Sequence, residues 1–231
     1  MKGMFIVLEG GDGAGKSSQQ TLLAAYFKKS GRKVRTLHFP RLQTKPYGEM
    51  IAAFLRGDYG PLDSVHPRLA ALLYALDRQE AAALIKDSLA AGEVFLADRY
   101  IFSNIAYQCA KTDDPAEKKA LASWIETLEY GHNGIPRPDL TLYLDVPLAF
   151  ALGNLAKERA GADRDYLKGA KDIHEASVEL QQKVRAEFLA LAKSRAGEMG
   201  VVNCAGDNGG IADKAVIHSR IIDALRYYDL L

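Results

Sequence analysis

The stretch of this sequence that decides the fold reads Gly10-Gly11-Asp12-Gly13-Ala14-Gly15-Lys16-Ser17. It fits the pattern G-x-x-x-x-G-K-[ST], which is typical of a loop that surrounds nucleotide phosphates. The apolar run at residues 4–8 predicts a buried strand before the loop, and residues 18–29 predict a helix after it. Because the pattern needs this strand, loop and helix order, we predict a phosphate loop rather than a glycine-rich turn with a surface lysine.

The residue types of the predicted loop indicate its chemistry. Glycines let the backbone turn tightly, so several N–H groups can point at one anion, and the start of the helix adds the positive end of its dipole. We expect Lys16 to reach the β- and γ-phosphates of ATP and Ser17 Oγ to bind Mg²⁺. The expected ATP-binding residues are therefore the loop itself, residues 10–17, together with Ser18.

Composition limits the classes of protein that fit. Hydrophobic residues make up 48% of the 231-residue chain, which suits a globular protein with a full core. Lysine and arginine number 30 against 29 aspartate and glutamate, so binding of nucleic acid through bulk charge is not expected. Cys109 and Cys204 have no metal-ligand spacing and predict reduced thiols in a cytoplasmic protein. The first strand begins too early to leave room for a signal peptide and is too short to cross a membrane.

Predicted strands and helices alternate along the chain. The strands are expected at residues 4–8, 34–37, 94–97, 140–144 and 200–203. The helices are expected at residues 18–29, 47–55, 67–91, 115–130, 147–156, 171–195 and 211–228. This alternation predicts an α/β fold of the phosphate-loop NTPase type, with a five-stranded parallel sheet between two helical layers. We see no linker or repeat and expect one domain over residues 1–231.

Charged residues gather where the predicted strands end. Ligands of parallel α/β sheets bind beyond the carboxyl ends of the strands, and Arg41 and Arg99 each follow a strand there. Arginines beside a phosphate loop suit the second substrate of a phosphoryl transfer. Asp98 ends a strand and is expected to bind Mg²⁺, or alternatively to cap the next helix. Asp12 is expected to contact a sugar hydroxyl or a metal-bound water, with a plain turn aspartate as the alternative.

An ordered set of motifs resembles the thymidylate kinase family. The motifs are Glu9-Gly10-Gly11-Asp12-Gly13-Ala14-Gly15-Lys16-Ser17-Ser18-Gln19, Phe39-Pro40-Arg41, Leu73-Tyr74-Ala75-Leu76-Asp77-Arg78, Asp98-Arg99-Tyr100-Ile101-Phe102-Ser103-Asn104-Ile105-Ala106-Tyr107-Gln108 and Pro138-Asp139-Leu140-Thr141-Leu142-Tyr143-Leu144-Asp145. The resemblance implies ATP-dependent phosphorylation of dTMP to dTDP with Mg²⁺, by a homodimer. Its small-molecule partners would be dTMP and ATP, with no nucleic acid or membrane involved.

The resemblance also implies roles at the phosphate-transfer end of the site. Arg99 resembles the catalytic arginine that binds the acceptor phosphate and bridges it to the donor. Arg41 resembles a second acceptor-phosphate arginine, with Phe39 nearby against the sugar or base. Lys16 and Asp12 complete this expected catalytic group, and Asp12 is also expected to touch dTMP.

Further residues are expected to recognise the base and sugar of dTMP. Tyr74 stands where the family usually has a phenylalanine that stacks on thymine, and Arg78 resembles the arginine that donates to a pyrimidine carbonyl. Asn104 and Gln108 resemble further polar contacts to the base. Tyr107 stands where its bulk disfavours a ribose 2′-hydroxyl, so the resemblance implies a deoxynucleotide acceptor.

The resemblance departs from some family members in the loop and the lid. Where those members carry a loop arginine this chain has Gly13, and in such proteins the lid supplies the catalytic arginine. We therefore expect residues 157–169 to form a short lid that contributes Arg159 or Arg164, with a solvated charged loop as the alternative. The lid pattern Asp-Arg-x-Glu is absent, because Tyr166 stands in its last position.

Two other functions fit parts of the pattern. A deoxynucleoside kinase shares the fold but needs a carboxylate base for its neutral hydroxyl acceptor, commonly just after the second strand, where this chain has Phe39-Pro40-Arg41. A catalytically inactive nucleotide-binding regulator would not need the acceptor-side arginines. The histidines show no ligand spacing and are predicted to be structural or surface residues.

Overall fold

The computed structural model describes residues 2–156, 162–170, 172–175 and 177–231. Its strands are β1 Met4–Glu9, β2 Val34–His38, β3 Val94–Asp98, β4 Leu140–Asp145 and β5 Met199–Asn203. The α-helices of the described part are α1 Lys16–Lys29, α2 Tyr47–Arg56, α3 Pro67–Ala90, α4 Ile101–Cys109, α5 Pro115–Glu126, α6 Leu148–Ala156, α7 Val178–Ser194 and α8 Lys214–Tyr227. Shorter helical turns are η1 Leu62–Ser64, η2 Thr127–His132 and η3 Ala162–Leu167.

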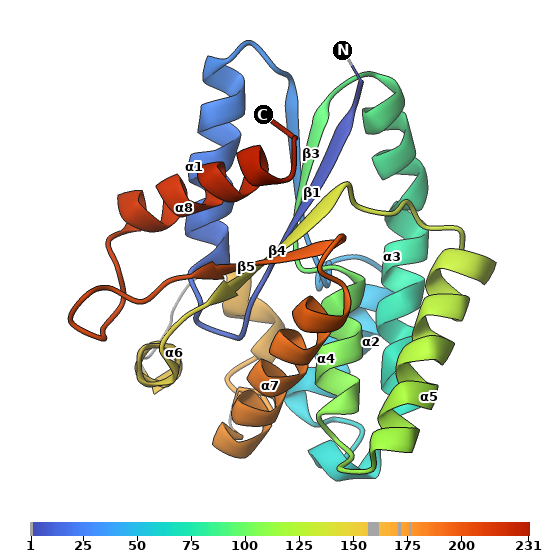
Figure 1. Ribbon diagram of the computed structural model, residues 1–231. Helices are drawn as coiled ribbons and strands as arrows, with labels where there is room; N and C mark the ends of the chain where they lie inside the picture. The colour runs from blue at the N-terminus through green and yellow to red at the C-terminus, as the bar shows by residue number, and fades with distance from the viewer. Residues whose placement is uncertain (1, 157–161, 171, 176) are drawn as a thin grey trace.

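The strands form one parallel sheet in the order β2-β3-β1-β4-β5, with β1 at its centre. Parallel neighbours cannot be joined by a tight turn, so helices connect them across the faces of the sheet (Figure 1). The predicted five-stranded parallel sheet is confirmed. Within the described ranges, no helix is both long and apolar enough to cross a bilayer.

Two hydrophobic cores lie on opposite faces of the sheet. Successive strand residues point to opposite faces, so Phe5 belongs to one core and Ile6 to the other, and both are fully buried. Residues of α3, α4, α5 and α7 complete the first core, and residues of α1, α6 and α8 complete the second. This arrangement confirms the predicted three-layer α/β/α sandwich, in which strands covered on both sides are apolar throughout.

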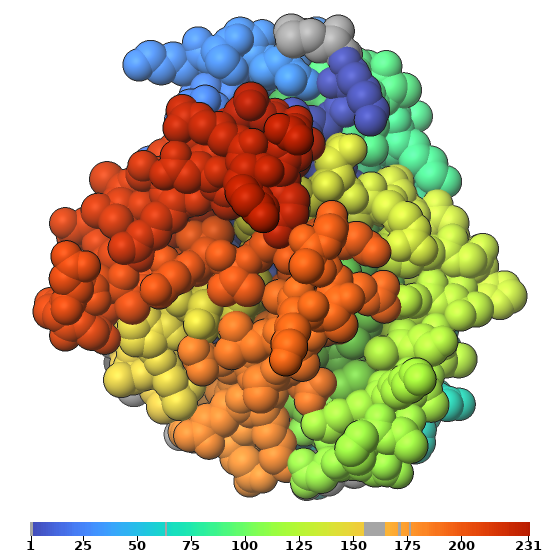
Figure 2. Space-filling view, viewed as in Figure 1, coloured from blue at the N-terminus to red at the C-terminus, as the bar shows by residue number. Residues whose placement is uncertain are grey.

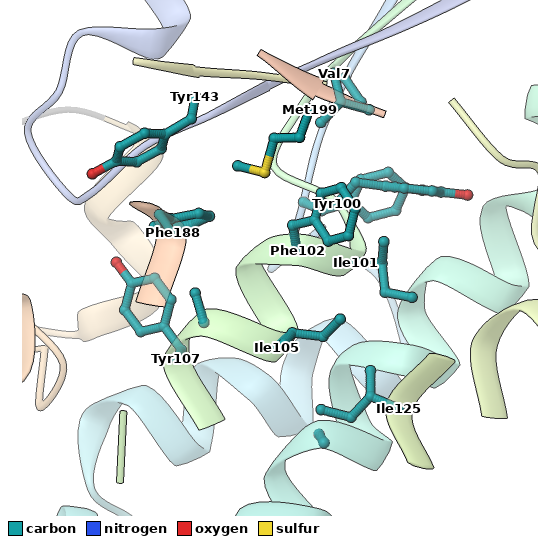
Figure 3. Close-up of a cluster of buried hydrophobic side chains, with 14 of the residues drawn as sticks. Val7, Tyr100, Ile101, Phe102, Ile105, Tyr107, Ile125, Tyr143, Phe188 and Met199 are labelled. Atoms are coloured by element: carbon teal, nitrogen blue, oxygen red, sulfur yellow. The ribbon is translucent and has the colours of Figure 1, made fainter. Parts of the chain in front are cut away.

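The outer helices cover the sheet closely. From the side shown in Figure 2, α8, α7 and α5 form most of the surface. Beneath them, the ring of Tyr143 stacks on Phe188, with centroids 4.7 Å apart and an interplanar angle of 18°. Figure 3 shows this pair with Met199 and the α4 residues Ile105 and Tyr107 in the same buried cluster. Helix α2 packs on α3 through a third, smaller core around Phe54.

The register of the sheet brings three strand ends level. Leu8 of β1 lies opposite Asp98 of β3, which in turn lies opposite His38 of β2. The residues that follow these positions therefore leave the sheet at the carboxyl ends of its strands. This end of the sheet carries the phosphate loop after β1 and Arg99 after β3.

Three predicted helices differ from the structure by three or more residues at one end. The helix predicted at residues 171–195 begins at Val178, where the Ser177 hydroxyl accepts from the N–H of Leu180 at 3.1 Å. Before it, the Asp172 carboxylate accepts from the N–H groups of His174 and Glu175, and this local turn competes with a helix.

The other two differences lie at helix ends. The helix predicted at residues 115–130 ends as α5 at Glu126 and continues as the π-helical turn η2. The helix predicted at residues 211–228 begins only at Lys214, because Ile211 forms an isolated antiparallel bridge with Ala205.

Candidate active site

The predicted phosphate loop joins β1 to α1 in the expected way. Gly13 and Gly15 have φ angles of 76° and 79°, a left-handed conformation that glycine adopts without a steric cost. Lys16 opens α1 and folds back over the loop, donating from Nζ to the carbonyls of Gly10 (3.2 Å) and Gly11 (3.0 Å). Burial lowers the pKa of Lys16, and the charge of Arg99 lowers it further.

A serine and an aspartate meet beside the loop. Ser17 Oγ donates to Asp98 Oδ2 at 3.0 Å, and Nδ1 of His38 lies 3.3 Å from the same oxygen. Burial alone would raise the pKa of Asp98, but Lys16 and His38 hold it at about 2, so the carboxylate is charged. Its other oxygen, Oδ1, is buried and has no hydrogen-bond partner among the described residues. Hydroxyl and carboxylate oxygens of this kind suit Mg²⁺.

The loop carboxylate of Asp12 lies at the centre of a polar network. Its Oδ1 accepts from Nη2 of Arg99 at 2.6 Å, and its Oδ2 accepts from the Tyr107 hydroxyl at 2.6 Å and from Nε2 of Gln181 at 3.0 Å. Although burial opposes it, the cations Arg99 and Lys16 hold the pKa of Asp12 well below its usual range. Asp12 thus links the phosphate loop to Arg99, a contact that the sequence alone did not predict.

The expected acceptor arginine Arg41 is fixed in place by acidic groups of α3. Its Nε donates to Asp77 Oδ1 at 2.8 Å, and its Nη2 donates to Glu80 Oε2 at 2.6 Å. Asp77 is fully buried and also accepts from the backbone N–H of Arg41 at 2.9 Å. Phe39 is almost wholly buried, 1% exposed, with its ring against Tyr100.

A buried ion pair holds the expected base-recognising arginine. Arg78 donates to Glu129 from Nε at 2.5 Å and from Nη2 at 2.7 Å, which leaves Nη1 as the nitrogen without a described partner. Glu129 also accepts from Nδ2 of Asn104 at 2.9 Å. In Gln108, which is fully buried, neither side-chain polar atom has a partner among the described residues, and the same is true of Asn104 Oδ1.

A single cavity of about 850 Å³ connects these groups. The predicted site residues that line it are Asp12, Gly13, Ala14, Gly15, Lys16, Ser17, Ser18, Phe39, Arg41, Tyr74, Arg78, Asp98, Arg99, Asn104, Tyr107 and Gln108. Gly10 and Gly11 lie behind them and accept from Lys16. The structure therefore brings the phosphate-loop side and the acceptor side of the predicted site into one space.

The predicted lid is only partly described. Arg159 lies outside the described residues, and Arg164 lies in η3 with its side chain outside them. The end of η3 contacts α2, because the Tyr166 carbonyl accepts from Nη1 of Arg56 at 2.7 Å. The Tyr166 hydroxyl donates to Asp172 at 2.7 Å.

Sequence analysis missed several residues of this site. Asp172 and His174 line the cavity, and His174, 5% exposed, stacks on Tyr107 with centroids 5.2 Å apart. His38, which was predicted to be a structural or surface residue, lies beside Asp98. Burial raises the pKa of Asp172 to about 6 and lowers that of His174 to about 3. Only the buried position of Asp172 and His174 reveals them, and no sequence spacing indicates it.

Comparison with known proteins assigns the family. Residues 8–208 match the family model described as thymidylate kinase. Thymidylate kinase of Mycobacterium tuberculosis (strain ATCC 25618 / H37Rv) is 36% identical over 189 residues, covering 82% of this chain and 86% of that protein. The probable thymidylate kinase of Thermococcus onnurineus (strain NA1) is 35% identical over 233 residues, covering 99% of each.

Solved structures show the same fold. The thymidylate kinase from Candida albicans superposes with a TM-score of 0.73 at 24% identity, covering 99% of this chain and 93% of that one. The thymidylate kinase from Ehrlichia chaffeensis gives a TM-score of 0.64 at 23% identity, covering 97% and 100%. With a family model matched over residues 8–208 and relatives matched over most of its length, this chain belongs to the thymidylate kinase family.

Proposed function

We propose that this protein transfers the γ-phosphoryl group of ATP to dTMP and forms dTDP. The observation that carries the proposal is the single cavity that exposes the phosphate loop at one end and, at the other, buried polar atoms of Asn104 and Gln108 that have no partner among the described residues. Membership of the family supports the same reaction.

The reaction needs little covalent chemistry from the protein. An oxygen of the acceptor phosphate attacks the γ-phosphorus in line, and because that oxygen is already an anion, no strong general base is required. Lys16 stabilises the charge of the donor phosphates and Arg99 that of the acceptor phosphate and the moving group. Ser17 and Asp98 would hold Mg²⁺, which neutralises charge on the phosphate oxygens when bound. The lid arginines Arg159 and Arg164 remain candidates for the same charge stabilisation.

The acceptor end of the cavity suits a pyrimidine deoxynucleotide. Gln108 and Asn104 offer donor and acceptor atoms that no described residue uses, and Nη1 of Arg78 is left for a base carbonyl. Tyr74 offers a flat face at the cavity wall. The Tyr107 hydroxyl donates to Asp12, and we expect the bulk of Tyr107 to disfavour a 2′-hydroxyl on the acceptor.

We further propose that the protein forms a homodimer and works in the cytoplasm. Helix α3 exposes Leu69 and Leu84, at 61% and 37%, and we expect a second copy to cover part of this helix. Light scattering should give twice the chain mass, and Leu69→Lys should shift it to the monomer. Cys109 and Cys204 are both buried free thiols, which supports a reducing compartment.

The test of the reaction is ADP release in a coupled assay with ATP and Mg²⁺. We expect dTMP to react faster than dUMP, dCMP, dGMP and the ribonucleotide TMP, and thymidine to be inert. Arg99→Ala should lower kcat about 100- to 1,000-fold, as loss of one donor to a developing charge does. Faster phosphorylation of thymidine than of dTMP would favour a nucleoside kinase, and ATP binding without turnover of any acceptor would refute the kinase proposal.

A further inference from the structure

A buried carboxylate lies directly behind the phosphate loop. Glu9 is the last residue of β1, is fully buried, and is not among the described residues that line the cavity. Its Oε1 accepts from the backbone N–H groups of Tyr100 at 2.9 Å and Ser103 at 3.0 Å, and its Oε2 accepts from the Ser103 hydroxyl. The carboxyl group of Glu9 therefore forms its hydrogen bonds with the segment that carries Arg99, and not with a substrate.

Those two N–H groups belong to the start of α4. Tyr100 is the N-cap of this helix and makes no capping hydrogen bond with its own side chain, while Ser103 is the third residue of the first turn. The N–H groups of a first turn have no carbonyl partner within the helix, and the one at the third position is the usual target of a capping side chain. Glu9 supplies this cap from the end of strand β1.

The residue just before the cap has an unusual backbone. Arg99 has a φ of 68°, a left-handed conformation that is strained for a residue with a Cβ. Such a conformation persists only where the surroundings hold it. The N–H of Arg99 donates to the carbonyl of Leu8 at 2.9 Å, and the next N–H, that of Tyr100, donates to Glu9. Consecutive residues of β1 thus fix both sides of the turn.

Glu9 also reaches the guanidinium group of Arg99 through one hydroxyl. Ser103 Oγ donates to Glu9 and accepts from Nη1 of Arg99 at 2.9 Å. With Nη1 fixed in this way, Nη2 is directed to Asp12 and Tyr107 at the cavity wall. The side chain is therefore oriented at both of its terminal nitrogens.

We propose that Glu9 is a positioning residue for the transfer reaction, acting through Arg99. Its carboxylate holds the backbone of the Arg99 turn and, through Ser103, the direction of the guanidinium group. The strand that leads into the phosphate loop thereby also sets the arginine on the acceptor side. The inference rests on the proposed function, in which Arg99 binds the acceptor phosphate.

The first experiment compares two Glu→Gln variants. Glu9→Gln keeps the shape of the side chain but replaces one acceptor oxygen by an NH₂ group. Glu93→Gln is the matched control, because Glu93 lies just before β3 at the opposite end of the sheet. We expect kcat for dTMP to fall about 10- to 100-fold in Glu9→Gln, the cost of a small misplacement in a reacting site. The Kd for ATP should stay within twofold, and Glu93→Gln should match the wild type.

The second experiment asks whether Glu9 acts through Arg99. In an Arg99→Ala background, Glu9→Gln should lower the rate less than threefold, because the group it positions is gone. An equal fall in both backgrounds, or wild-type turnover in Glu9→Gln, would overturn the proposal. If Glu9→Gln does not fold, Ser103→Ala replaces it in the same cycle, since it leaves the carboxylate and both backbone hydrogen bonds intact.

A third readout does not depend on turnover. Hydrogen exchange of the Tyr100 and Ser103 amides should be at least tenfold faster in Glu9→Gln than in the wild type, and unchanged in Glu93→Gln. Unchanged exchange would refute the structural part of the inference even if the protein phosphorylates dTMP. If exchange is faster in Glu9→Gln but the wild-type protein does not turn over dTMP, the proposed function is refuted and the positioning of Arg99 by Glu9 is kept.

Discussion

Replacing Glu129 by glutamine should leave the guanidinium group of Arg78 charged and buried without a counter-charge. Arg78 is 2% exposed and Glu129 is fully buried. The carboxylate accepts two hydrogen bonds from Arg78 and one from Asn104. In Glu129→Gln one oxygen becomes an NH₂ group, so a donor faces a donor of Arg78 in the protein interior.

The expected loss of stability is large for one atom exchanged. Breaking a buried ion pair by removing one partner costs about 3–5 kcal/mol, because the remaining charge stays buried. For a chain of this size each kcal/mol lowers Tm by about 2–4 °C, so Tm should fall by about 6–20 °C. The KM for dTMP should rise as well, since Nη1 of Arg78 loses its fixed direction.

Thermal and urea unfolding at pH 7 measure this effect, with Glu126→Gln as the matched control. Glu126 lies one turn earlier and pairs with Arg195, whose side chain is 31% exposed. Surface pairs of this kind contribute about 0–1 kcal/mol. If Glu129→Gln destabilises the protein by less than 1 kcal/mol, as the control should, then the buried pair does not hold Arg78 and our reasoning is wrong.

Three further changes test other parts of the structure. Burial raises the pKa of Asp172 to about 6, so its protonated side chain contributes fully to the free energy of unfolding below pH 4, and this contribution is lost as the pH rises through 6. In urea unfolding, the stability of Asp172→Asn relative to the wild type should therefore increase by up to about 3 kcal/mol between pH 4 and pH 8. Asp98→Asn should raise the Mg²⁺ concentration for half-maximal rate about 10- to 100-fold in a metal titration, and an unchanged titration would exclude Asp98 from the metal site. Phe188→Ala should cost about 3–5 kcal/mol in urea unfolding because Phe188 is fully buried against Tyr143, and a loss below 1 kcal/mol would contradict tight packing there.

The sequence predicted the parts of the fold that depend on local patterns. Apolar runs marked the strands, and the glycine pattern marked the loop between β1 and α1. The parallel sheet then brought Ser17 and Asp98 together, as the expected metal site requires. Helix ends were predicted less well, because the cap at Ser177 and the turn at Asp172 use side-chain hydrogen bonds that compete with helical periodicity.

The residues that support the site could not be predicted from local patterns. Glu9 and Tyr100 are 91 residues apart, Arg78 and Glu129 are 51 apart, and Asp12 and Gln181 are 169 apart. Each pair forms only when distant elements pack. Glu9 gave one signal, a carboxylate at the end of an apolar strand, whereas Glu129 and Gln181 lie in helical segments where an acidic or amide side chain is ordinary.

The central position of β1 has a consequence for synthesis of the chain. Its neighbours in the sheet are β3 and β4, so Met4 can pair only after Val94 has been synthesised, and Ile6 can pair with β4 only after Leu140 has been synthesised. At about 5–20 residues per second, the ribosome needs about 7–27 seconds to make the intervening segment up to Leu140. Until Val94 is made the apolar strand that leads into the phosphate loop has no partner on either side, and until Leu140 is made it has a partner on one side at most. The central strand of the sheet is thus the one that depends longest on the nascent chain staying free of aggregation.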